Sequence, residues 1–591
     1  MQPETKICQN CKNSFTIEPD DFLFYEKMKV PPPTWCPECR LKRRMVWRNE
    51  RNLYRVKDAV SGQEVFSGIP PQAPVKVYDH DFWWSDGWDP MEYGREYDFS
   101  RPFFEQFLKL MQNVPFPSRN IQNLINSDYS DQGGDLKNCY LCFNSGKVED
   151  SAYILNANLV KDSFDLNDAS SVEISYASLG IGESYKVFFS FYCDRSNNLW
   201  FSQNCVGCSF CFGCINLRNK QYHIFNKPYA AEDYFEEVKK FNLNSYGGLS
   251  KAYEEARKFW DSRPRKFIHG YQNTDSSGEN IYFSKNVKFS FGIESGEDLK
   301  YCQEIYRQAG YWEGGKDSYD HYNWGYGTEL MYEVCGSGRG CKNVRFCLDC
   351  WPAVQDLEYS MRCGSSNNLF GCLGLRKKSY CILNKQYAPE EYFALRERII
   401  RHMNEMPYVD KQGRVYKYGE FFPIEFSLFA YNETVAGDYF PLAKEESEKL
   451  GYVWRDTEPR EYQTTIDAND LPDRIGDATE DVLKEVIRCL SCKRAYRIIP
   501  SEFNFLKAQS IPLPRLCFNC RYLRRFSFRN KPKYYERKCQ CAGNSSERKI
   551  YQNQTTHFHK NLPCPNEFET SYAPDRQEIV YCESCYQAEV A

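Results

Sequence analysis

The chain of 591 residues has no long apolar run, and its first residues lack the basic region and apolar stretch of a signal peptide. No segment approaches the ~20 apolar residues of a membrane span. Lysine and arginine together number 76 against 80 aspartates and glutamates, so no global positive field attracts nucleic acid or an anionic membrane. We therefore expect a cytoplasmic protein without a membrane partner, in which any nucleic-acid contact is local.

Common catalytic signatures are also missing from the sequence. It has no glycine-rich phosphate loop, no His-Glu-x-x-His and no Gly-x-Ser-x-Gly. Histidine is scarce, with 7 residues, and no segment has low complexity. The aromatic content of 16% indicates a folded chain rather than a disordered one. Since domains typically take roughly 100–200 residues each, we expect several.

Cysteine, by contrast, is abundant, with 28 residues. In a reducing compartment so many thiols predict metal sites and buried side chains rather than a disulfide framework. Two groups share one spacing, in which the same interval separates a first Cys-x2-Cys pair from a second. Zn²⁺ takes four such ligands in a tetrahedron. The predicted ligands are Cys8, Cys11, Cys36 and Cys39, and separately Cys489, Cys492, Cys517 and Cys520.

Around each group the segment resembles the probable zinc-ribbon, treble-clef-like family. In that family a Cys-x2-Cys knuckle, a hairpin and a second Cys-x2-Cys that opens a helix share one zinc. The resemblance covers about forty residues at each end and implies the eight cysteines above as ligands, but no activity. The whole chain also resembles bacterial zinc-binding proteins that place paired fingers around a Cys-rich repeat region, and this resemblance likewise implies no activity.

A stripe of arginines follows each second cysteine pair. If a helix begins there, the residues fall at i, i+3, i+4, i+7 and i+8, on one face. The first stripe is Arg40, Arg43, Arg44, Trp47 and Arg48, and the second is Arg521, Arg524, Arg525, Phe528 and Arg529. Guanidinium groups with an interleaved aromatic suit phosphates and unstacked bases, so we predict RNA contact here. An acidic protein partner and a plain solvated face are the alternatives.

The C-terminal end carries more candidate ligand residues, cysteines and histidines, than one tetrahedral metal site needs. "CPNEF" matches the second half of a knuckle, which places Cys564 with Cys582 and Cys585. The fourth ligand is open among Cys539, Cys541 and the two histidines of "HFH", and we list Cys541 and His559. A separate zinc on Cys539, Cys541, His557 and His559 is an alternative. We expect three structural zinc sites in the chain.

The segment after the first finger is similar to this C-terminal module. "SGQEVFSGIPPQAPVKVYDHDFWW" aligns with "CPNEFETSYAPDRQEIVYCESCYQ". Ser61, Asp79 and Phe82 stand at the ligand positions and cannot form a thiolate site. We therefore expect a degenerate, metal-free finger there.

Short units recur between the fingers, each with an aromatic or its substitute at intervals of eleven to thirteen positions. Alternating apolar and small residues, separated by Gly, Asn, Asp or Ser, predict short strands and tight turns. Stacked, these units predict a parallel solenoid in two arrays, with about two units in each coil. The amphipathic "FFEQFLKLMQ" could cap the first array.

Two features inside the arrays carry possible chemistry. Cys205, Cys208, Cys211 and Cys214, at steps of three, are expected to be buried core thiols, with an iron–sulfur cluster or a zinc as alternatives. Cys335, Cys341, Cys347 and Cys350 are treated in the same way. The pairs Asp162 with Asp165 and Asp317 with Asp320 could act as acid and base in a carbohydrate-active β-helix, although aspartate also favours solenoid turns.

The predicted fold class is mainly β with α additions, a parallel β-solenoid in two arrays flanked by treble-clef-like zinc fingers and short helical segments. The expected order is a finger (1–50), a degenerate finger (51–100), a helical cap (101–135), the first array (136–228), a helical insert (229–278), the second array (279–386), a helix and mixed linker (387–480), a finger (481–530) and a C-terminal finger (531–591).

The predicted function is that of a non-enzymatic zinc-binding protein. It would bind RNA or a ribonucleoprotein through the arginine stripes and use the solenoid as a scaffold. A scaffold for protein partners on the solenoid is the second hypothesis, and a carbohydrate-active enzyme is the third.

Overall fold

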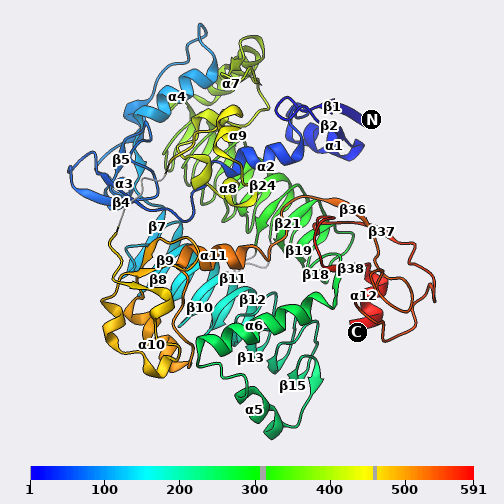
Figure 1. Cartoon of the computed structure of the whole chain (residues 1–591). Coiled ribbons are helices and arrows are strands. Elements are labelled where there is room, and N and C mark those ends of the chain that lie inside the picture. The colour runs from blue at the N-terminus through cyan, green and yellow to red at the C-terminus, as the bar shows by residue number, and fades with distance from the viewer. Residues whose placement is uncertain (1, 307–313, 457–461, 591) are drawn as a thin grey trace. The chain divides into compact units, whose positions relative to one another are not determined.

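The computed structural model describes residues 2–306, 314–456 and 462–590. Parts of the predicted second array (307–313) and of the linker (457–461) lie outside the described residues. The predicted fold class is confirmed: the chain is mainly β, with parallel solenoid arrays (Figure 1). Clusters of cysteines lie towards both ends of the sequence.

The first array is one parallel sheet that winds from β7 to β15 and closes with the antiparallel β16. Its strands are β7 (Ile121–Ile125), β8 (Gly133–Lys137), β9 (Tyr140–Glu149), β10 (Ala152–Lys161), β11 (Phe164–Glu173), β12 (Tyr176–Phe188), β13 (Asn197–Trp200), β14 (Ser209–Phe212), β15 (Gln221–Ile224) and β16 (Lys227–Pro228). Ala152 pairs with both Tyr140 and Phe164, which lie twelve positions before and after it in the chain. One unit is therefore one coil, and the expected two units per coil is wrong.

Every third residue of a coil points inward, because the residue before it turns a corner. Asn138, Leu141, Asn144 and Lys147 all have positive φ, and the same step of three continues along the array. The side of each coil is therefore only three residues long, which leaves room inside for small side chains. Ser163 is typical: it is fully buried, donates to the Lys161 carbonyl, and accepts from the Ser175 amide of the next coil.

The second array repeats this design, with a register of twelve or thirteen positions between successive coils over most of its length. Its strands are β18 (Gly270–Tyr271), β19 (Gly278–Tyr282), β20 (Lys285–Lys288), β21 (Ser290–Glu294), β22 (Glu297–Lys300), β23 (Gln303–Ile305), β24 (Lys316–Trp324), β25 (Glu329–Ser337), β26 (Lys342–Arg345), β27 (Gln355–Glu358), β28 (Asn367–Phe370), β29 (Ser379–Ile382) and β30 (Lys385–Gln386). An antiparallel β29–β30 hairpin and α7 (Pro389–Glu405) end it, as β15–β16 and α5 (Ala231–Lys239) end the first.

Each finger places a hairpin before a helix that begins at a cysteine. In the N-terminal finger these elements are β1 (Glu4–Ile7), β2 (Ser14–Ile17), α1 (Pro19–Met28) and α2 (Pro37–Met45). The later finger has β34 (Ile487–Arg488), β35 (Ala495–Tyr496), α10 (Pro500–Ala508) and α11 (Phe518–Phe526). The C-terminal module has β36 (Tyr535–Lys538), β37 (Glu567–Thr570), β38 (Ile579–Tyr581) and α12 (Glu583–Val590).

The chain forms two compact units, and each unit is discontinuous in sequence. The first unit comprises 1–119, 268–456 and 531–534, and the second comprises 120–267, 457–530 and 535–591. The N-terminal finger thus belongs with the second array, and the two later fingers belong with the first array. The remaining elements of the first unit are β3 (Tyr54–Lys57), β4 (Glu64–Ser67), β5 (Val77–Tyr78), α3 (His80–Trp84), α4 (Phe103–Asn113), β6 (Phe116–Pro117), β31 (Tyr408–Val409), β32 (Val415–Tyr416), α8 (Val435–Tyr439) and α9 (Lys444–Lys449). Those of the second unit are α6 (Tyr246–Asp261), β17 (Pro264–Lys266) and β33 (Ile466–Asp467).

One helix expected on the first array belongs to the second. Phe103 of α4 is buried, and its ring lies 5.3 Å from that of Phe370 in β28. In the second unit, α6 is the helix that packs on the first array. The ring centroids of Tyr253 and Phe201 lie 5.8 Å apart, and those of Trp260 and Phe191 lie 5.9 Å apart. Among the described helices, none has the length and apolar content needed to span a membrane.

Candidate metal centres

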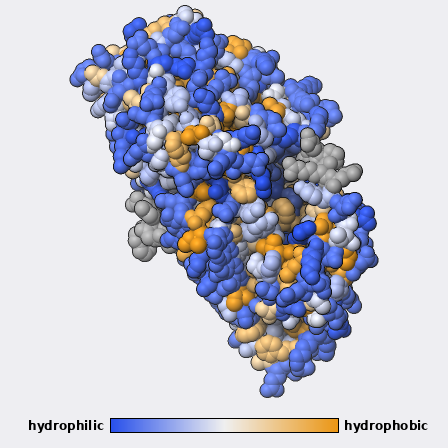
Figure 2. Space-filling view, turned by 90° about the vertical axis from the view of Figure 1, so that its left-hand side faces the viewer, coloured by the Kyte–Doolittle hydropathy of each residue, from blue (hydrophilic) through white to orange (hydrophobic). Residues whose placement is uncertain are grey.

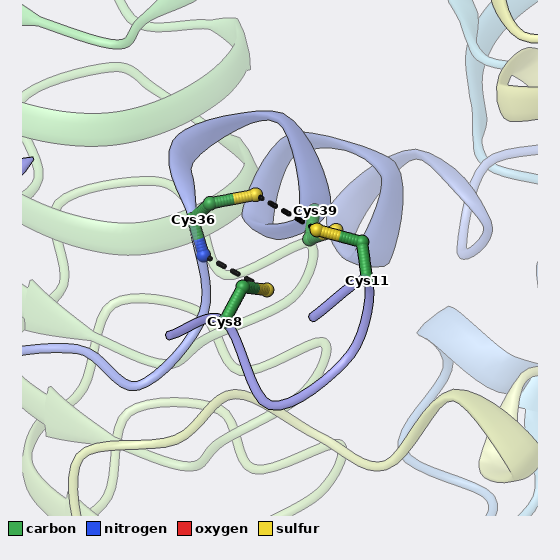
Figure 3. A group of neighbouring side chains, drawn as sticks. All are labelled: Cys8, Cys11, Cys36 and Cys39. Carbon is green, nitrogen blue, oxygen red and sulfur yellow. Dashed lines mark hydrogen bonds between the residues drawn. The ribbon is translucent and has the colours of Figure 1, made fainter. Parts of the chain in front are cut away.

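The first group of thiols lies where the β1–β2 hairpin meets α2 (Figure 3). Cys8 directly follows β1, Cys11 lies in the hairpin turn, Cys36 caps α2 and Cys39 lies in the first turn of that helix. All four sulfur atoms lie within 4.8 Å of one another. The short turn and the helix start thus bring together two pairs that are distant in sequence.

Hydrogen bonds reach two of these sulfur atoms and favour the thiolate form of Cys8. The Cys36 amide donates to Cys8 Sγ at 3.3 Å, and the Asn10 side-chain amide donates to Cys39 Sγ at 3.3 Å. Hydrogen bonds from the Cys36 and Cys39 thiols lower the pKa of Cys8 well below its ordinary value. Thiolate is the form that binds a metal ion.

The second group repeats this geometry with Cys489, Cys492, Cys517 and Cys520. The Cys517 amide donates to Cys489 Sγ at 3.2 Å, as Cys36 does to Cys8. Burial alone would raise the pKa of Cys489, but backbone hydrogen bonds from Cys517, Cys492 and Ser491 bring it down to about 7.

Sulfur separations in both groups match a tetrahedral metal site. The Cys11–Cys36 pair is 3.8 Å apart and the Cys492–Cys517 pair 3.6 Å apart. A zinc with Zn–S bonds of about 2.3 Å places its sulfur ligands about 3.8 Å apart, whereas a disulfide bond is about 2 Å long. All four residues of each group are free cysteines. The residues therefore suit a closed, four-coordinate metal of the structural type.

The C-terminal module contains a third group, and its fourth ligand is Cys539, one of the candidates that the sequence left open. Cys539, Cys564, Cys582 and Cys585 converge, with 3.8 Å between Cys564 and Cys582. Cys539 directly follows β36, as Cys8 follows β1, and accepts the Cys582 amide at 3.2 Å. Cys541 and His559, which were predicted as ligands alongside Cys564, instead join Cys585 in a neighbouring group. The basic strand before each first ligand, "TKIC", "VIRC" and "ERKC", is the sequence signal that would have identified Cys539.

A fourth group lies beside the third and shares one residue with it. Cys541, His557, His559 and Cys585 place their ligand atoms within 4.8 Å of one another. His557 Nδ1 lies 3.4 Å from Cys541 Sγ, and His559 Nε2 lies 3.2 Å from Cys585 Sγ. The predicted alternative of a second C-terminal metal is therefore matched for three ligands, with Cys585 in place of Cys539. Within the described residues four groups could hold a metal, where three had been expected.

The degenerate finger has a carboxylate where the other modules have their first thiol. Asp58 directly follows β3, and its side chain accepts from the Asp79 amide at 2.9 Å and the Ser61 amide at 2.6 Å. Burial raises the pKa of Asp58, but the hydrogen bonds from Ser61 and Asp79 hold it below its ordinary value. These bonds join the hairpin to α3 without a metal, and Phe82 occupies the last ligand position of the alignment.

The arginine stripe of α2 is buried against the second array rather than presented to solvent. Arg40 and Arg44 both pair with Asp320 at 2.9 Å, and Arg43 and Arg44 pair with Glu333 at 2.7 and 2.8 Å. Each of these side chains is at most 1% exposed. Burial would raise the pKa of Glu333, but Arg43, Arg44 and Arg40 together hold it below its ordinary value.

The stripe of α11 docks on the first array in the same way. Arg521 and Arg525 pair with Asp165 at 3.0 and 3.1 Å, and Arg529 pairs with Asp168. The guanidinium of Arg524 lies 4.1 Å from the Tyr253 ring centroid, and Phe528 stacks on Phe191 at 4.0 Å.

The buried arginines of these stripes have carboxylate partners in place of the phosphates that were predicted, whereas Arg524 is exposed and its nucleic-acid role stays a prediction. Arginines that are buried and paired with carboxylates cannot bind phosphates without leaving their partners. Trp47 is also buried, against Phe422, and Arg48 is buried beside Glu50 and Asp349. Whether the chain binds RNA elsewhere stays a prediction.

The aspartate pairs that could have acted as acid and base have structural roles in the coils. Asp165 and Asp320 are fully buried and accept the arginines just described. Asp162 and Asp317 have φ values of 45° and 46° and turn the corners of their coils. Neither pair offers two free carboxylates for acid–base chemistry.

The two groups of cysteines within the arrays face into the coils, except Cys335, whose sulfur lies 3.8 Å from the Arg44 carbonyl of α2. Cys205, Cys208, Cys211 and Cys214 are each at most 1% exposed, and their steps of three follow from the three-residue sides. Cys335, Cys341, Cys347 and Cys350 are all fully buried. Burial raises the pKa of Cys341 to about 12.

Comparisons with known proteins add little to this geometry. No family model matches the chain, and no curated protein matches it. One solved structure, described as a "putative acetyltransferase" from Desulfovibrio desulfuricans, is 10% identical over 50% of this chain and 75% of its own, with a TM-score of 0.10. A likeness this weak supports no argument about fold or activity.

Proposed function

We propose that this chain is a non-enzymatic, zinc-dependent scaffold, in which thiolate-bound metals hold the arginine helices on the solenoids. One observation carries the proposal: in both fingers, a group of four cysteines lies at the start of the helix whose arginines enter a buried acidic site on an array. Structural zinc sites contribute folding energy directly, so the metal would stabilise both the finger and its docking.

One exposed row of side chains along the first array favours a protein partner over RNA. Lys137, Glu149, Lys161 and Glu173 occupy one position of successive coils, and all four are exposed. Their charges alternate in sign, so neighbouring coils neutralise one another and form no cationic track. Hydrophilic residues also dominate the face in Figure 2, where apolar residues occur in scattered groups.

Two measurements on the full-length chain test this proposal. Elemental analysis of the purified protein should find zinc in a fixed whole-number ratio to protein, and a chain that folds without bound metal would overturn the proposal. Binding of labelled random-sequence RNA across a salt series should be weak even at low salt. Tight binding that falls linearly in log salt would instead support the RNA hypothesis.

A further inference from the structure

The two C-terminal groups meet at one sulfur atom. Cys585, in the first turn of α12, belongs both to the group with Cys539, Cys564 and Cys582 and to the group with Cys541, His557 and His559. From the shared sulfur, Cys564 Sγ lies 3.6 Å away on one side and His559 Nε2 3.2 Å away on the other. Both separations are those of ligands on a common metal.

The second group is supplied by an insertion into the knuckle of the first. In the other two four-cysteine fingers, two residues separate the knuckle cysteines, whereas a much longer segment separates Cys539 from Cys564. Cys541, His557 and His559 all lie in this added segment. The insertion therefore brings the three additional ligands to a thiolate that the finger already has.

Partners outside the group orient both histidines for metal binding. His557 Nε2 donates to Glu589 at 2.9 Å, which leaves Nδ1 facing Cys541. His559 Nδ1 donates to the Leu562 carbonyl at 2.5 Å, which leaves Nε2 facing Cys585. Metal-bound histidines in proteins nearly always have such a carboxylate or carbonyl on the other ring nitrogen.

The same carboxylate fixes the inserted loop on α12. Glu589 also accepts the Gln554 amide at 2.8 Å and the Thr555 amide at 3.2 Å. The Asn553 side-chain amide donates to Cys541 Sγ at 3.1 Å, which favours its thiolate form. His557 and Cys541 are 4% and 1% exposed, so this polar group lies inside the module.

We propose that the C-terminal module holds a dinuclear zinc centre in which the Cys585 thiolate bridges the two ions. The inference rests on the proposed zinc-dependent function and adds a second kind of site to it. One ion takes Cys539, Cys564, Cys582 and Cys585, and the other takes Cys541, His557, His559 and Cys585. With neutral histidines, five thiolates and two Zn²⁺ leave one negative charge, whereas a single Zn²⁺ with four thiolates carries two. Sharing the sulfur therefore reduces the charge that the buried module must accommodate.

The test is the metal content of the full-length, zinc-loaded protein and of three variants. The wild type should hold four zinc ions per chain, His557→Ala with His559→Ala should hold three, and Cys585→Ser should hold two. His223→Ala serves as the matched control, since its ring bonds to the Gln221 carbonyl in the first array, outside the C-terminal module, and it should keep four. In the protein loaded with ¹¹³Cd²⁺, a bridging sulfur should produce scalar coupling between two cadmium resonances.

The metal counts distinguish failure of the dinuclear centre from failure of the proposed zinc-dependent function. Three ions in both the wild type and the double-histidine variant, with no cadmium–cadmium coupling, would overturn the dinuclear centre and leave the zinc-dependent scaffold intact. A wild-type chain without bound zinc would overturn the proposed function as well. If Cys585→Ser does not fold, the double-histidine count and the cadmium coupling still decide.

Discussion

At the scale of single residues, the unexpected feature is the pairing of the arginines with buried acids on distant coils. Asp320 lies 280 residues after Arg40 in the sequence, yet they form a buried ion pair. The arginine periodicity places Arg40, Arg43 and Arg44 on one face of α2, whereas Trp47 and Arg48 lie beyond the end of that helix. It could not predict burial, because the partners come from a different repeat and only the tertiary fold brings them together.

Removing one acid should test this docking. Asp320→Asn keeps a residue that tolerates positive φ but leaves Arg40 and Arg44 without their shared carboxylate, so we expect a loss of about 3–5 kcal/mol. Asp317→Asn, at a similar corner, loses only an exposed pair with Lys27 and should cost under about 1 kcal/mol. Chemical denaturation of the zinc-loaded protein measures both. Equal losses would argue against a docking role for Asp320.

Asp58 should show the pH dependence of a group with a lowered pKa. Its hydrogen bonds to the Ser61 and Asp79 amides require the charged form, so their contribution is complete above the ordinary aspartate pKa of about 3.9 and is lost as pH falls through the lower folded value. Protection factors of these two amides should fall in Asp58→Ala at pH 7, and the difference from wild type should shrink in acid. A difference that is constant with pH would contradict this account.

At the scale of elements, the sequence correctly indicated a repeated unit of about twelve residues, but the number of units in one coil was wrong. The aromatic spacing indicated a unit of about a dozen positions, but a spacing alone does not distinguish one coil from half a coil. The small or aliphatic residues at every third position, such as Ser151, Ile154 and Ala157, carried that information, because four sides of three residues close a narrow coil. The fourth ligand beside Cys564, Cys582 and Cys585 was left open for a related reason, since an insertion separated Cys539 from the knuckle pattern.

The coil length predicts which deletions the first array tolerates. Removing residues 199–210 takes out one complete coil and should keep the β-type circular dichroism and a cooperative thermal transition. Removing residues 199–204 takes out half a coil and should yield aggregated protein, because the strands that follow lose their partners. Similar behaviour of the two deletions would contradict the register of one unit per coil.

At the scale of the whole molecule, two units of the same plan are interleaved along one chain. In each unit a four-cysteine finger presents arginines to an aspartate of an array: Arg40 and Arg44 to Asp320, and Arg521 and Arg525 to Asp165. Those aspartates end the matching sequences "DSYD" and "DSFD". Each finger is distant in sequence from its own array, so the contacts that hold it there come from the helices α2 and α11, which begin at the cysteine groups.

The most direct test of the account is hydrogen–deuterium exchange of the full-length protein with zinc bound and after removal of zinc by a chelator under reducing conditions. We predict that amides of α2 and α11 (37–45 and 518–526) exchange much faster without metal, while those of β9–β11 and β24–β25 (140–173 and 316–337) stay protected. Unchanged protection of α2 and α11 would show that the arginine helices dock without metal and would contradict the central claim.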